Sequence, residues 1–143
     1  MTAFDDIVER LLPGYIARGY VERAACRAAC PHEPQLIVSL LREAEPRGLF
    51  QQQVLGHLTA LAAELLAERG EPLVVGRALN YIAYQMDSSD AVIRVAGDAG
   101  DFLGAFMKAG TVVCEGSCGD FAFQGASGGI GLVGGNAGQF CGE

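Results

Sequence analysis

The chain has 143 residues and a formal net charge of −7, and half of its residues are hydrophobic. This length fits one domain, or one compact domain with a helical appendage, and the apolar content is sufficient for a buried core. The acidic balance and the lack of a basic stripe argue against nucleic acid and against an anionic membrane surface as partners.

The expected compartment follows from the N-terminus and the cysteines. Asp5, Asp6 and Glu9 interrupt the apolar run that a secretory signal needs, and no apolar run in the chain approaches the ~18 residues of a membrane span. We therefore expect a cytoplasmic protein without a membrane partner, in which the five cysteines are reduced thiols.

Residues 1–72 are predicted to form an α-helical support or interaction region. Apolar residues recur at helical spacing over residues 4–18, where Thr2 is a possible N-cap and Pro13 is expected to end or kink the helix. A short helix is expected over residues 21–30 because this segment is rich in alanine and arginine.

Two further helices are predicted over residues 33–45 and 49–69, and Gly70 is the expected C-cap of the second. The apolar face of the second helix comprises Val54, Leu55, Leu58, Leu61, Leu65 and Leu66. Residues 73–86 also show helical spacing, so we expect residues 73–90 to form a cap on the structure that follows.

From residue 91 onward the sequence has a regular 19-residue repeat. A Gly-x-x-Gly motif recurs three times, and a phenylalanine follows each copy. The residues concerned are Gly97, Gly100 and Phe102, then Gly116, Gly119 and Phe121, then Gly135, Gly138 and Phe140. We expect these glycines to form tight turns, with φ > 0 at positions among Gly100, Gly119 and Gly138.

A short β-type apolar run precedes each glycine motif. Because a 19-residue unit cannot bury its own apolar face, the units are expected to stack as a β-solenoid of about three coils over residues 73–143. In this register Val95, Cys114 and Val133 form one interior line. The predicted fold class is therefore α+β, with an N-terminal α-helical region followed by a short β-helix.

The segment over residues 97–110 resembles the glycine-rich C-terminal domain of the glutamate synthase large subunit. The residues that carry the resemblance read GDAGDFLGAF and then KAG, and the lead-in GRALNYIA over residues 76–83 is similar as well. The same repeat occurs in one of the subunits of formylmethanofuran dehydrogenase. The resemblance covers about residues 75–143, and it implies a right-handed, single-stranded β-helix that carries no catalytic residues.

The function that this resemblance implies is a non-catalytic scaffold or assembly subunit that supports a partner oxidoreductase or amidotransferase. A subunit of a formylmethanofuran dehydrogenase-like complex is an alternative. The chain has fewer coils than the synthase domains and lacks their amidotransferase and flavin-binding domains, so the resemblance extends to fold and assembly, and not to a reaction.

Ser127 lies in a G-x-S-x-G motif, which is typical of the nucleophile of α/β-hydrolases, so a small Ser127-dependent hydrolase is a further alternative. The motif requires a downstream histidine, however, whereas His32 and His57 both lie upstream. It also occupies a corner of the repeat. We therefore expect a structural turn at Ser127 and no catalytic residue.

A metal or cofactor site is not expected. Cys26 and Cys30 lie one helical turn apart, with His32 nearby, and could form half of a metal site. The other cysteines replace small apolar residues of the repeat, which indicates buried thiols. The run over residues 129–134 matches a dinucleotide fingerprint, but the repeat already accounts for its glycines.

The last coil is expected to be the contact surface. It is predicted to expose backbone groups together with Leu132, Val133 and Phe140, a combination that favours strand addition. We expect either a homo-oligomer, formed by pairing of these edges, or a complex with a protein partner that continues the β-helix. Pure self-assembly through stacked solenoid ends is the third class of function.

Overall fold

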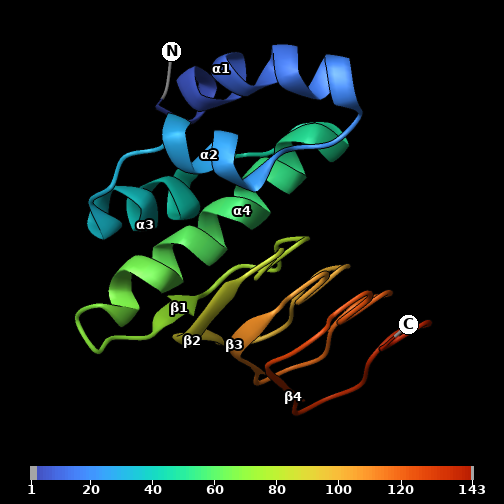
Figure 1. Cartoon of the computed structure of the whole chain (residues 1–143). Helices are drawn as coiled ribbons and strands as arrows, with labels where there is room; N and C mark the ends of the chain where they lie inside the picture. The colour runs from blue at the N-terminus through green and yellow to red at the C-terminus, as the bar shows by residue number, and fades with distance from the viewer. Residues whose placement is uncertain (1–2, 143) are drawn as a thin grey trace.

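The computed structural model describes residues 3–142, which form four α-helices followed by a parallel four-stranded sheet wound as a solenoid of about three turns (Figure 1). The helices are α1 (Ala3–Arg18), α2 (Arg23–Ala29), α3 (Pro34–Glu43) and α4 (Gly48–Ala67). The strands are β1 (Leu73–Val75), β2 (Asp87–Val95), β3 (Ala109–Cys114) and β4 (Ile130–Val133), paired in that order. The structure confirms the predicted α+β fold class.

Pro13 does not end the first helix, because α1 continues through it to Arg18. Proline removes one backbone N–H and leaves the carbonyl of Glu9 without its helical donor. Pro13 and Glu9 are both exposed, so water can satisfy this carbonyl and the helix does not end there. The predicted N-cap Thr2 lies outside the described residues.

The helix α4 is the central element of the molecule. It was predicted to bury one face, but the segment from Val54 to Ala63 is buried without interruption. The reason is visible in Figure 1: the other helices cover one side of α4, and the first strands of the solenoid cover the opposite side. The helix ends at Ala67 with Glu68 as its C-cap, so the prediction of Gly70 as the C-cap is wrong. Gly70 follows the helix with φ +71°, and the N–H of Glu71 donates to the carbonyl of Leu66 at 3.0 Å.

The predicted helix over residues 73–86 is wrong, because this segment is the first coil of the solenoid. Its strand β1 pairs with β2, and Tyr81, Ala83 and Gln85 have φ of 62°, 65° and 56°, which an α-helix excludes. The helical spacing of its apolar residues instead reflects residues that point into the solenoid or toward α4. The role of cap, assigned to residues 73–90, therefore belongs to α4.

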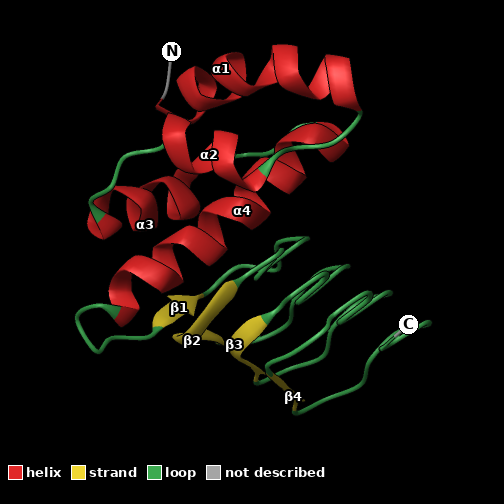
Figure 2. Ribbon diagram, in the orientation of Figure 1, coloured by secondary structure: helices red, strands yellow, loops and turns green. Residues whose placement is uncertain are grey.

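The predicted 19-residue register is confirmed in the lower coils. Cys114 pairs with Val95 on one side and with Val133 on the other, each exactly one repeat away along the chain. The first coil is longer: the pairing of Val75 with Val95 spans one residue more than the repeat, and the β2–β3 register shifts between Asp87 and Val92. Figure 2 shows each strand followed by a loop that turns back to begin the next coil.

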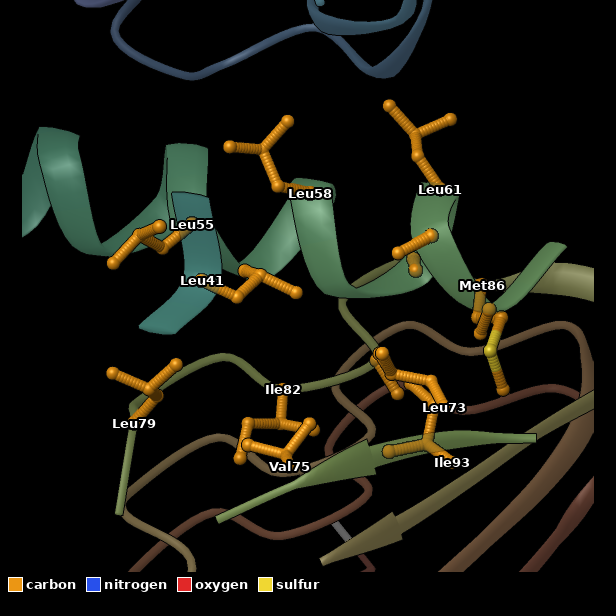
Figure 3. Close-up of a cluster of buried hydrophobic side chains, with 14 of the residues drawn as sticks. Leu41, Leu55, Leu58, Leu61, Leu73, Val75, Leu79, Ile82, Met86 and Ile93 are labelled. Carbon is orange, nitrogen blue, oxygen red and sulfur yellow. The ribbon is translucent and has the colours of Figure 1, made fainter. Parts of the chain in front are cut away.

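One hydrophobic core joins the helices to the solenoid. The underside of α4 packs on inward-facing residues of the first coil, which include Leu73, Val75, Leu79, Ile82 and Met86 (Figure 3). Ile93 and Val112 continue this core into the next coils, and both are fully buried. The two halves of the chain therefore share buried apolar surface and stabilise one another.

The contact between α4 and the first coil is close and specific. Thr59 Oγ1 donates to the carbonyl of Gly56 at 2.6 Å and accepts the N–H of Ala83 at 2.9 Å. Gly56 has no room for a side chain, since a Cβ there would lie 2.4 Å from the carbonyl oxygen of Tyr81. The helix thereby supplies an acceptor for an N–H of the coil that would otherwise be buried without a partner.

We predict that Thr59→Val lowers the free energy of unfolding by about 1–3 kcal/mol, because valine keeps the shape but leaves the Ala83 N–H unsatisfied. Denaturant titration followed by circular dichroism measures this change. The matched control is Thr111→Val on the partly exposed face of β3, where a change within about 0.5 kcal/mol is expected. Equal losses for the two variants would contradict the capping role of Thr59.

Candidate protein-binding surface at the last coil

Two ladders of polar side chains connect each coil to the next. In the first ladder Asp98 Oδ1 accepts the N–H of Ser117 at 2.8 Å, and Ser117 Oγ accepts the N–H of Asn136 at 2.9 Å. The bonds of both ladders have the same direction. In each bond a side chain of one coil accepts a backbone N–H from the coil that lies farther from the helices. The ladders end at the last coil.

The second ladder runs beside the first through Asn80, Asp101, Asp120 and Gln139. Each of its first three side chains accepts the N–H of the next member at 2.8 Å. Within residues 3–142, the terminal side chains Asn136 and Gln139 have no coil below them and no hydrogen-bond partner. Both ladders therefore finish in a free amide on the last coil.

Backbone hydrogen bonds complete the contact between coils and show what the last coil offers. The N–H groups of Cys118 and Phe121 donate to the next coil, at 2.9 Å and 2.8 Å, as do their equivalents one coil above. The corresponding groups of the last coil are the N–H groups of Ala137 and Phe140. Together with the amides of Asn136 and Gln139, they form a surface on the side of residues 130–142 turned away from the helices, which we call the open face.

An aromatic column follows the same edge of the solenoid. The rings of Tyr81, Phe102, Phe121 and Phe140 stack with centroid separations of 4.7, 5.1 and 5.0 Å. All four residues have φ near +60°, a conformation that costs a non-glycine residue about 1–2 kcal/mol. Stacking offsets part of that cost. Phe140 ends the column and is 52% exposed, so its outer ring face belongs to the open face.

The predicted reason for the corner glycines is wrong for Gly100, Gly119 and Gly138, none of which has positive φ. Their constraint is the closeness of the coil above. A Cβ on Gly119 would lie 2.0 Å from Asp101 Oδ1, and a Cβ on Gly138 would lie 2.3 Å from Asp120 Oδ1. Glycine is needed because the carboxylate that accepts the next backbone N–H passes directly over it.

Two of the other three glycines of the motif follow the same pattern, and Gly97 does not. Gly97 does have positive φ, at 129°, and meets nothing within 4 Å. At Gly116 and Gly135 a Cβ would instead lie 2.3 Å from Asp98 Oδ1 and 2.4 Å from Ser117 Oγ. Except at Gly97, close contact between coils, and not backbone conformation, therefore requires glycine at these positions.

We predict that Gly119→Ala lowers the free energy of unfolding by about 1–3 kcal/mol, since the new methyl group displaces the Asp101 carboxylate from its bond to Asp120. Gly76→Ala is the control, because a Cβ at Gly76 meets nothing within 4 Å and its φ is ordinary. Thermal unfolding of the two variants under identical conditions measures the difference. A melting temperature for Gly119→Ala equal to that of Gly76→Ala would show that the coils are not in close contact at this corner.

The predicted contact residues lie at three different places on the last coil. Leu132 continues the outward-facing line of β3 and is 57% exposed, like its neighbour Ile130. Val133 pairs with the buried Cys114 and is half-buried at the end of the interior line. Phe140 ends the aromatic column. The last coil therefore exposes apolar side chains around the open face, and whether they form an interface remains a prediction.

Ser127 occupies a solenoid corner, where its backbone N–H donates to the carbonyl of Met107 at 2.9 Å. Within the described residues, neither histidine forms a hydrogen bond with Ser127. His32 Nε2 lies 3.3 Å from the carbonyl oxygen of Arg27, and His57 Nε2 lies 3.1 Å from that of Val21. The triad geometry that the nucleophile hypothesis requires is therefore not assembled within the described residues.

His57 is a buried, neutral component of α4. Its ring packs 4.7 Å from the ring of Tyr84, and Nε2 donates to the Val21 carbonyl, which leaves Nδ1 without a partner among the described residues. Burial in apolar surroundings lowers the pKa of His57 to about 4, and the bond to Val21 offsets part of this shift. Protonation of His57 therefore opposes folding.

We predict that His57 destabilises the folded state as the pH falls below about 6.5, the pKa of an unfolded histidine. Because the folded pKa is lower, the unfolded chain binds the extra proton, and stability is lost between pH 6.5 and 4. Relative to His57→Gln, the parent chain should lose about 2 kcal/mol of unfolding free energy between pH 7 and pH 4.5. Urea titrations at several pH values test this, and parallel curves for the two proteins would contradict it.

Cys26 and Cys30 do not form a metal site in the structure. Burial raises the pKa of both thiols, and Cys26 is the fully buried residue of α2. Residues 3–142 contain no group of three or more His, Cys, Asp or Glu side chains arranged to hold a metal ion. In the solenoid, Cys114 and Cys118 are buried as predicted, whereas Cys141 is exposed on the last coil.

A charged cleft that the sequence did not predict lies between α2, α4 and the start of β2. Its volume is about 360 Å³. Glu64 is its central residue: the carboxylate pairs with Arg23, lies 4.0 Å from Arg27 Nη1 and accepts the N–H of Asp87 at 3.0 Å. These groups come from three elements that are far apart in the sequence, so no local spacing could have indicated the cleft.

Comparison of the chain with protein-family models, with curated proteins and with solved structures gave no match. The resemblance to the glutamate synthase domain therefore remains a prediction from the sequence motif. None of the helices in the described part of the chain combines the length and the apolar character that a membrane span requires.

Proposed function

We propose that this protein is a non-catalytic assembly module that binds another polypeptide through the open face of its solenoid. The observation that carries this proposal is the way both polar ladders, the aromatic column and the backbone hydrogen bonds run through every coil and finish in groups that lack a partner within residues 3–142. Each of these groups is satisfied in the coils above by one more polypeptide layer.

The composition of the last coil supports the same proposal. Exposed edges of β-structures are usually protected against association by charged residues or proline. Residues 121–142 contain neither, although the whole chain carries a net charge of −7. Ile130, Leu132 and Phe140 are more than half exposed beside this edge. Such an edge favours addition of a further layer.

The predicted resemblance suggests what the partner would be. Glutamate synthase-like domains of this kind support neighbouring catalytic units, so the proposal includes a cytoplasmic oxidoreductase or amidotransferase complex that contains this chain as a scaffold subunit. The module would then hold such a unit at a fixed position, because α4 and the solenoid share one core.

We predict that Phe140→Asp abolishes the assembly that contains this chain, while Ile16→Asp leaves it intact. Phe140 lies on the open face, and aspartate tolerates its positive φ but places a charge at the edge. Ile16 is 74% exposed on α1 and provides the same change of charge far from the open face. The tagged chain is purified from its natural source, and the native mass and composition of the complex are measured for both variants.

Circular dichroism must show that both variants are folded. Assembly that survives Phe140→Asp, or that is lost equally with Ile16→Asp, would contradict the assignment of the open face as the binding surface.

A further inference from the structure

We propose that the open face binds a second copy of this chain, so that two solenoids meet end to end about a two-fold axis. This inference rests on the proposed function, since it names the partner of the same surface. It follows from which end of the solenoid is free, from the residue types at the ends of the ladders, and from the charge of the last coil.

The helical end of the solenoid excludes a head-to-tail filament. The backbone of the first coil is already engaged there by α4, through Thr59 with Ala83 and through Glu64 with Asp87. A Cβ at Gly56 would lie 2.5 Å from Tyr81 Cβ, so the helix and the coil leave no space for another chain. Of the two solenoid ends, only the open face is therefore available, and identical copies that join through it form a closed two-fold dimer.

The ladder ends can pair with an identical surface, and as amides they can also accept the N–H of a further coil, as Asn80 does. The acceptors within the solenoid include the carboxylates of Asp98, Asp101 and Asp120, which cannot donate hydrogen bonds. At the last coil these positions hold Asn136 and Gln139, whose amides both donate and accept. When two open faces meet with the axis across this corner, each amide faces an amide and can pair reciprocally, whereas carboxylates would repel.

The charge and shape of the last coil also permit two acidic chains to approach. No charged side chain occurs over residues 121–142, so the contact itself adds no repulsion to that between two molecules of net charge −7. The exposed ring face of Phe140 can stack on Phe140 of the second copy, which continues a column already spaced at 5.0 Å. The association should accordingly change little with salt.

A different occupant, a coil donated by another protein in the parallel direction, would present backbone N–H groups to the side chains at positions 136 and 139. This is the environment that Asp98, Asp101 and Asp120 already have. A carboxylate at the open face would then bind as well as an amide or better. The two occupants therefore predict opposite responses to the same substitution.

The decisive variant of the full chain is Asn136→Asp with Gln139→Glu, which changes only the amide groups. We expect the parent chain to be a dimer in sedimentation equilibrium at neutral pH, and the variant to dissociate with a Kd at least about tenfold higher. High salt should restore part of the affinity of the variant by screening the facing carboxylates. Gln35→Glu with Ser39→Asp, on the exposed face of α3, is the control of equal charge and should dimerise like the parent.

Hydrogen exchange provides a second measurement that does not depend on the variant. The N–H groups of Ala137 and Phe140 should exchange more slowly as the concentration of the parent chain rises. A parent chain that is monomeric up to about 100 µM would overturn the two-fold dimer, and so would a double variant that dimerises as tightly as the parent. If the chain is monomeric alone but its natural complex is still lost with Phe140→Asp, the proposed function stands and only the second copy is rejected.

Discussion

The structure depends on hydrogen bonds between successive coils, because a single coil cannot satisfy its own backbone. In a helix each N–H finds its acceptor one turn away, whereas here the acceptor lies one coil away on a neighbouring layer. The side chains of the two polar ladders add a second set of bonds, in which the donor always lies on the coil farther from the helices. The close contact that these bonds require also explains why most glycines of the repeat motif leave no room for a side chain.

The two ends meet that need differently, and the helices explain why. At the first coil α4 replaces the missing layer with Thr59, Glu64 and a packed apolar underside. At the last coil no described element takes this place, and Asn136, Gln139 and Phe140 are left without neighbours on one side. The helical region is therefore more than an appendage, because α4 covers one end of the solenoid while the other end is uncovered within residues 3–142.

The sequence was sufficient to predict the lower coils because their repeat maps directly onto space. Equal spacing of Phe102, Phe121 and Phe140 becomes a stacked column, and equal spacing of Val95, Cys114 and Val133 becomes an interior line. The first coil escaped prediction because it is longer than the repeat, both in its strand and between the stacked rings of Tyr81 and Phe102. The first coil is therefore out of phase with the 19-residue repeat, and the spacing of its apolar residues resembled the spacing in a helix.

Other features could not be predicted because their causes lie between distant segments. The corner glycine Gly119 was assigned to backbone conformation, but the carboxylate of Asp101 on the coil above is what excludes a side chain. Burial of His57 depends on Val21 and Tyr84, which lie far from it in the sequence on either side. The local spacing of residues does not indicate such contacts. A strict repeat, in contrast, indicates which residues of successive coils lie next to each other.

The irregular first coil has a consequence for how such a chain can change in length. Its extra residues lie between Asp87 and Val92, where the register of β2 with β3 shifts. Beyond this segment each coil contacts only coils of the regular repeat. Duplication or loss of one repeat would therefore shift the open face by a single layer while the helical contact and the terminal amides stay the same.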